Sequence, residues 1–197
     1  ELVGFHKLEL TKENKIVKDE DGIYLEFNAI AKGYCLDRMA AYLNSKGIEN
    51  YLIELGGELI AKGKKQDSNT YWLAGIESPN KDGSRSIAKT VYLKNRAMAT
   101  SGNYRKFKID TVTGKKYVHT INPLSGYPEE NDMLSASVFA PNCALADAYA
   151  TAFMAMGYNR SKDLLSELEN IDAYFMYLDT LNEIKEYTSP GIKKSIN

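Results

Sequence analysis

The chain has 197 residues, of which 44% are hydrophobic and 26% charged, and its formal net charge is −1. These values suit one globular domain with a full hydrophobic core. The balanced charge excludes a basic surface for nucleic acid or for an anionic membrane, and the longest apolar runs are too short to cross a bilayer.

The chain opens on Glu1 instead of Met and carries no signal peptide, so we interpret it as a fragment of a longer domain. Its two cysteines, Cys35 and Cys143, both fall within apolar helical patterns. We therefore expect packed thiols, because the sequence offers neither a disulfide framework nor a metal-ligand spacing.

The stretch from Tyr24 to Gly57 organises the rest of the chain. Alternation of apolar and polar residues predicts a strand over 24–27, and a helix is expected from near Ala31 until Gly47, where glycine favours a left-handed cap. The expected buried stripe of this helix is made of apolar residues three or four apart, namely Ala31, Cys35, Leu36, Met39, Ala40 and Leu43. A second apolar strand is predicted over 51–55.

Lys32 and Gly33 are expected in the first turn of this helix. Free N–H groups at a helix N-terminus favour an anion, so the first functional hypothesis is a phosphate site. The alternative is ordinary packing of a strand-to-helix turn.

The remaining elements follow in order. We expect short strands within 1–22, further strands at 58–61, 71–76, 87–93, 97–100, 107–109, 116–119, 134–140, 173–178 and 183–187, and helices at 142–157 and 161–168. Thr113-Gly114 indicates a hairpin turn, and 122–128 a loop. Because strands and helices mix without a regular βαβ alternation, the α+β class is favoured.

Three later stretches offer chemistry. Ala99–Tyr104 (ATSGNY) places hydroxyl groups beside a glycine, which suits a phosphate, although a plain turn is the alternative. His119 lies at a strand end before a rigid loop, where a general base is plausible, although such a histidine is more often structural.

The third stretch lies on the helix after Pro141. Asp147 and Thr151 are four residues apart and so share one helical face among small alanines. A carboxylate and a hydroxyl are suitable ligands for Mg²⁺, which takes few protein groups and often substrate phosphates. The alternative is a tightly packed helix with Asp147 solvated or capping.

Taken together, these segments resemble a known family. The sequences AIAKGY from Ala29, ELGGE from Glu54, ATSGNY from Ala99, HTINPLSGYP from His119 and ADAYAT from Ala146 are similar to the ordered motifs of the ApbE family of flavin transferases. The resemblance extends from about residue 24 to 157. It implies an α+β fold with mixed or antiparallel sheets and packed helices, in which residues 1–197 form a single domain that lacks the N-terminal part of the family fold.

The resemblance also implies an activity, namely Mg²⁺-dependent transfer of FMN from FAD to a Ser or Thr hydroxyl of an acceptor protein, with release of AMP. The implied metal ligands are the Ala29 carbonyl, Asp147 and Thr151. The implied FAD contacts are Glu26, Lys32, Thr100, Ser101, Gly102 and Ile121. His119 is implied as the base that activates the incoming hydroxyl, which suits a histidine near its ordinary pKa.

Some positions depart from the family pattern. Asn122 stands where the family loop commonly has Asp, and Glu26 stands where Asp is usual. The family leads us to expect a periplasmic or cell-surface bacterial lipoprotein, with membrane contact only through a missing N-terminal anchor. Two other hypotheses remain: an FAD pyrophosphatase that yields FMN and AMP, and a non-catalytic flavin-binding module.

Overall fold

The computed structural model describes residues 2–80, 84, 86–103, 126 and 131–197, together with the backbone of 107–109 and 116–118. The helices are α1 (Asn28–Ser45), α2 (Cys143–Met156) and α3 (Tyr158–Glu167), with 3-10 turns at Phe5–Lys7 and Pro190–Ile192. The strands are β1 (Leu8–Leu10), β2 (Ile16–Lys18), β3 (Tyr51–Leu55), β4 (Glu58–Lys62), β5 (Trp72–Glu77), β6 (Ile87–Leu93), β7 (Ala97–Gly102), β8 (Phe107–Ile109), β9 (Lys116–Val118), β10 (Met133–Ala140), β11 (Asp172–Leu178) and β12 (Ile184–Thr188). Within the described ranges, none of the helices combines the length and hydropathy needed to span a bilayer.

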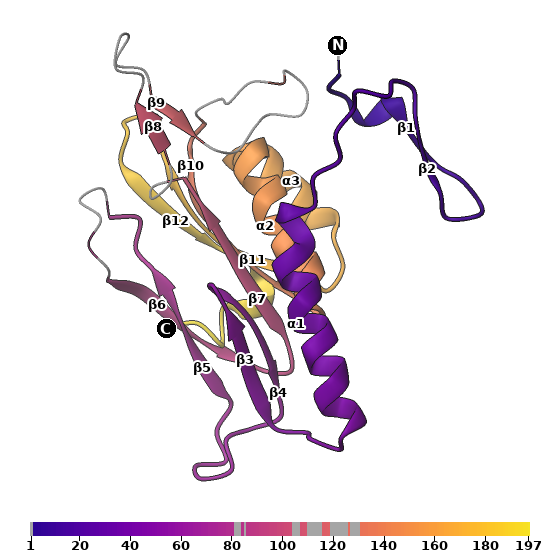
Figure 1. Ribbon diagram of the computed structural model, residues 1–197. Helices are drawn as coiled ribbons and strands as arrows, with labels where there is room; N and C mark the ends of the chain where they lie inside the picture. The colour runs from indigo at the N-terminus through magenta and orange to yellow at the C-terminus, as the bar shows by residue number, and fades with distance from the viewer. Residues whose placement is uncertain are drawn as a thin grey trace.

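A six-stranded sheet in the order β12-β11-β10-β7-β4-β3 forms the centre of the molecule, and every pairing in it is antiparallel. The helices α1, α2 and α3 lie along one face of this sheet, and the β5–β6 hairpin lies on the other (Figure 1). The α+β class expected from the sequence is confirmed.

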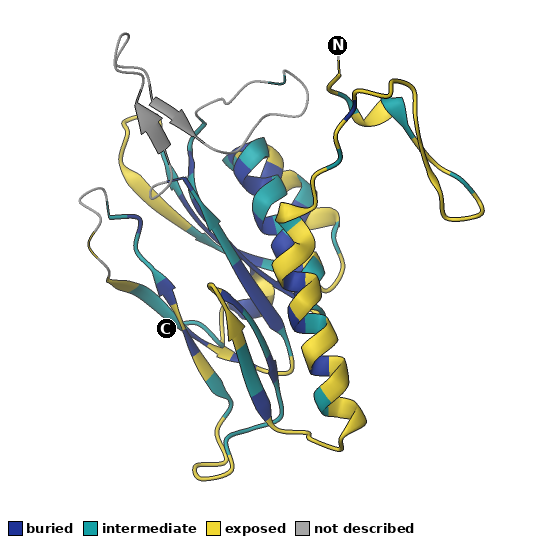
Figure 2. Cartoon of the chain, viewed as in Figure 1, coloured by how far each residue is buried: buried dark blue, intermediate teal, exposed yellow. Residues whose placement is uncertain are grey.

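Two hydrophobic layers hold this arrangement together. On the helix side, Ala97, Ala99 and Ala136 of the sheet pack with Ala146 and Ala150 of α2, all fully buried. Such small side chains let the helix approach the sheet closely. On the other side, large side chains fill the space beneath the hairpin, namely Ile76, Val91, Leu93, Met98, Phe139, Tyr174 and Met176. Figure 2 shows the buried residues concentrated where α2 and the central strands meet.

Most of the predicted elements are confirmed. The bounds of β3 and β6 match the expectation, and α2 begins as expected after Asn142, whose side chain accepts a 2.9 Å hydrogen bond from the Leu145 N–H. Gly47 has φ +73° and follows the end of α1, as a left-handed cap requires. The β8–β9 pairing confirms the hairpin, while its turn at Thr113-Gly114 lies outside the described residues.

The strand predicted over 24–27 is wrong. These residues are irregular and α1 begins at Asn28, so Lys32 and Gly33 lie in its second turn instead of its first. Tyr24 and Phe27 are exposed. Alternation alone cannot make a strand where no neighbouring strand offers a hydrogen-bonding partner.

The predicted buried stripe of α1 is also largely wrong. The buried residues are Gly33, Leu36 and Ala40, and the stripe through Ala31, Cys35 and Met39 faces outward. Cys35 is therefore an exposed thiol, whereas Cys143 is buried as expected. The reason is the contact between α1 and α2, which selects the face that contains the glycine.

Candidate functional site

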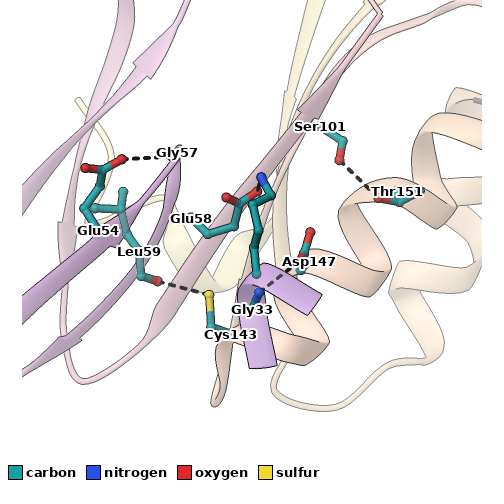
Figure 3. Close-up of polar contacts among 10 residues, drawn as sticks. Gly33, Glu54, Gly57, Glu58, Leu59, Ser101, Cys143, Asp147 and Thr151 are labelled. Carbon is teal, nitrogen blue, oxygen red and sulfur yellow. Dashed lines mark hydrogen bonds and ion pairs between the residues drawn. The ribbon is translucent and has the colours of Figure 1, made fainter. Parts of the chain in front are cut away.

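The site is built on the crossing of α1 and α2. A Cβ on Gly33 would lie only 2.3 Å from the carbonyl oxygen of Cys143, so glycine is needed for the helices to approach this closely. At the crossing, the Gly33 N–H donates to Oδ2 of Asp147 at 3.0 Å (Figure 3). The glycine thus brings the Asp147 carboxylate against the N-terminal half of α1.

A second carboxylate links the same two helices, but this one belongs to α1 and accepts hydrogen bonds from α2. Asp37 of α1 accepts hydrogen bonds from the N–H groups of Cys143 (2.7 Å) and Ala144 (2.9 Å) in the first turn of α2. These N–H groups have no partner within their own helix, and a negative charge is favoured there. Each helix therefore supplies a carboxylate to the backbone of the other.

The oxygen ligands predicted from the sequence lie around this crossing. In the helical register the Gly33 N–H also faces the Ala29 carbonyl, and two acceptors that share one donor are within about 6 Å of each other. Thr151 follows Asp147 by one turn of α2, and its Oγ1 is 3.3 Å from Oγ of Ser101 on β7. Hydrogen bonds thus link Gly33 of α1 with Asp147 of α2, and Thr151 of α2 with Ser101 of β7.

Burial controls the charge at this site. Asp147 is only 4% exposed, and burial raises its pKa, an effect opposed by the Gly33 hydrogen bond and by the Lys32 charge. A carboxylate, a hydroxyl and a backbone carbonyl are the hard oxygen donors that Mg²⁺ prefers. Across the described ranges, no cluster of three or more His, Cys, Asp or Glu side chains that could hold a metal ion is found, either at this crossing or elsewhere.

Sequence reasoning gave no role to Glu58, although it belongs to the quoted ELGGE motif. Its Oε1 lies 2.5 Å from Nζ of Lys32, and its side chain is 4% exposed while that of Lys32 is 47% exposed. Burial raises the pKa of Glu58, Lys32 lowers it, and the charge of Asp147 raises it further. The sequence did contain a signal for Glu58, because it is a charged residue at the start of an apolar strand, directly after a Gly-Gly turn.

The other predicted residues lie in different surroundings. Glu26 is exposed and accepts a hydrogen bond from the Asn28 side chain. Thr100 bonds Ser137 at 2.8 Å, and because strand residues alternate, its side chain lies on the sheet face opposite to that of Ser101. Gly102 is the last residue of β7, whereas His119 and Ile121 lie outside the described residues.

Comparison with known proteins identifies the family of this chain. A sequence profile described as the ApbE family matches residues 1–175. The chain belongs to the ApbE family. Similar ApbE proteins include the FAD:protein FMN transferase of Vibrio cholerae, 38% identical over 181 residues, which cover 91% of this chain and 52% of that protein. The FAD:protein FMN transferase of Haemophilus influenzae is 32% identical over 195 residues, which cover 98% of this chain and 55% of that protein.

Solved ApbE structures share the fold. The flavin transferase ApbE from Vibrio cholerae superposes with a TM-score of 0.82 at 33% identity, covering 98% of this chain and 59% of that one. The apo flavinyl transferase ApbE of Pseudomonas stutzeri gives a TM-score of 0.78 at 29% identity, and the match covers 96% of this chain and 56% of that one. The chain thus spans about half the length of the curated ApbE relatives it matches.

Proposed function

We propose that this protein is an FAD:protein FMN transferase that depends on Mg²⁺. The observation that carries the proposal is the 3.0 Å contact between Asp147 and the Gly33 N–H, which holds a buried carboxylate at the helix crossing, one helical turn from the Thr151 hydroxyl. The names of similar ApbE proteins supply the flavin substrate and the protein acceptor.

The donor set fits a magnesium ion. Asp147, Thr151 and the Ala29 carbonyl would hold it, and its remaining positions suit water and phosphate oxygens. When bound, Mg²⁺ offsets the charge of a pyrophosphate and acts as a Lewis acid on it.

The residues of this chain have distinct tasks in the proposed reaction. Lys32, with a half-exposed side chain, would bind the dinucleotide through its phosphates, and Ser101 would donate a hydrogen bond there. His119 would take the proton from a Ser or Thr hydroxyl of the acceptor. The hydroxyl oxygen then forms a bond to the phosphorus of the FMN half, the pyrophosphate P–O bond breaks, and AMP leaves with the electron pair.

The test is incubation of the full-length chain with FAD, MgCl₂ and a candidate acceptor protein, followed by mass spectrometry of the intact acceptor. We expect the acceptor to gain the mass of one FMN unit, and we expect the gain to be absent in EDTA and with Asp147→Asn. Release of FMN and AMP without an adduct would identify a pyrophosphatase instead. Bound but uncleaved FAD would identify a flavin-binding module.

We also propose the periplasmic or cell-surface location that the family leads us to expect. Cell fractionation with an antibody against the chain tests it, and recovery in the cytoplasmic fraction would contradict it.

A further inference from the structure

The start of β4 carries an ion pair that the proposed metal ligands do not include. Oε1 of Glu58 lies 2.5 Å from Nζ of Lys32. Its second oxygen, Oε2, is buried and has no hydrogen-bond partner among the described residues. Leaving a buried carboxylate oxygen without a partner costs stability, so the unpartnered Oε2 indicates a functional role for Glu58.

The chain brings this ion pair next to Asp147. Lys32 and Gly33 are consecutive residues of α1, and the first bonds Glu58 while the second bonds Asp147. Behind them, the Cys143 thiol donates to the carbonyl of Leu59, the residue after Glu58, at 3.7 Å. Figure 3 shows Glu58 and Asp147 gathered around the same turn of α1.

The charges of this group do not balance. Among the residues that the structure describes, the two buried carboxylates, Glu58 and Asp147, share one nearby ammonium group, that of Lys32, so within that part of the chain one negative charge has no cationic partner. Water screens such buried charges only weakly, so a cation at Asp147 would be attracted by Glu58 and repelled by Lys32.

We propose that Glu58 and Lys32 form a positioning pair that sets the cation affinity of the site at Asp147. The Glu58 carboxylate strengthens cation binding. It also holds the Lys32 ammonium at the edge of the site, where the exposed part of that side chain stays available to a phosphate group of the dinucleotide. This inference rests on the proposed function, because it assigns the pair to the same metal and phosphate site.

The test uses Mn²⁺ alone, without nucleotide, titrated into the full-length chain and followed by the EPR signal of free Mn²⁺. We expect Glu58→Gln to weaken binding about three- to tenfold, as one unit charge several ångströms from a divalent ion would. Lys32→Met should tighten binding by a similar factor, and the double variant should return close to the wild type. A purely structural role would not give effects of opposite sign.

The matched control is Glu54→Gln, which makes the same chemical change on the same hairpin. The Glu54 side chain accepts a hydrogen bond from the Gly57 N–H at 2.9 Å and does not contact Lys32, so we expect unchanged binding. If Glu58→Gln binds Mn²⁺ as tightly as Glu54→Gln does, the inference is overturned while the proposed function stands. If the wild type binds no Mn²⁺, or Asp147→Asn binds it equally well, the proposed metal site itself fails.

Thermal unfolding without metal gives a second readout. Lys32→Met leaves the buried Glu58 carboxylate unpaired and should lower Tm, and adding Glu58→Gln should restore it. Failure of the second change to restore stability would show that the two residues do not act as a pair.

Discussion

The amide nitrogen of Gly33 lies 3.0 Å from Oδ2 of Asp147, and this contact joins helices α1 and α2 through two residues that are 114 positions apart in the chain. The glycine permits the approach and also supplies the hydrogen bond that holds the carboxylate. Local stability and the proposed metal site therefore depend on the same few atoms.

Gly33→Ala should destabilise the fold. The added Cβ would meet the backbone of α2 at 2.3 Å, so the helices must separate. Overpacking of this kind costs about 1–3 kcal/mol, and because the clash is with backbone we expect the upper part of that range, which exceeds the ~1 kcal/mol that alanine gains in helix propensity. Chemical denaturation measures the difference, with Ala41→Leu on the exposed side of α1 as the control. Equal stability of Gly33→Ala and wild type would contradict the close crossing.

Asp147→Asn should stabilise the metal-free protein at neutral pH and abolish its stabilisation by Mg²⁺. The pKa of Asp147 is raised above its ordinary value of 3.8, so the folded state holds the proton to a higher pH than the unfolded state does. Stability is therefore lost as the pH rises from about 4 through the raised pKa, and the neutral amide avoids that loss. Thermal melts from pH 4 to 8, with and without MgCl₂, measure both effects. A Tm that rises equally with Mg²⁺ in both proteins would exclude Asp147 as a ligand.

Asp37→Ala should weaken the start of α2. Its carboxylate accepts from two N–H groups there, and loss of such a cap costs about 1–2 kcal/mol. Asp37→Asn keeps one acceptor and should lose less. Urea unfolding ranks the three proteins, and an Asn variant less stable than the Ala variant would argue against a capping role.

The two cysteines should differ sharply in reactivity. Cys35 is exposed, whereas burial raises the pKa of Cys143 to about 12. Since the thiolate is the reactive form, iodoacetamide at pH 8 should modify one thiol in the folded protein and two after denaturation. Rapid modification of Cys143 in the native state, seen by peptide mass spectrometry, would show that α1 and α2 separate readily.

His119→Ala should lower the rate of FMN transfer about 100- to 10,000-fold, the usual contribution of a general base. FAD affinity should change little, because the proposed base acts on the acceptor hydroxyl. Fluorescence titration with FAD and the acceptor mass assay separate the two properties. Transfer at the wild-type rate would remove His119 from the mechanism.

The sequence by itself was enough to predict most strands, the start of α2 and the α+β class. These features depend on local signals, such as the two-residue alternation of Ile87–Leu93 or the cap at Asn142, which act over a few residues. Asp147 and Thr151 could be paired in the same way, because their spacing alone places them on one face of a helix.

Only the tertiary structure decided which face of α1 is buried. Apolar residues occur on several sides of that helix, so periodicity allowed the outward stripe of Ala31 and Cys35 as readily as the buried one of Leu36 and Ala40. The choice comes from the backbone approach at Gly33, and the position of Glu58 beside Lys32 follows from it. Contacts between residues so distant in the chain produce no periodic pattern in the sequence, because they depend on how whole helices and strands pack together.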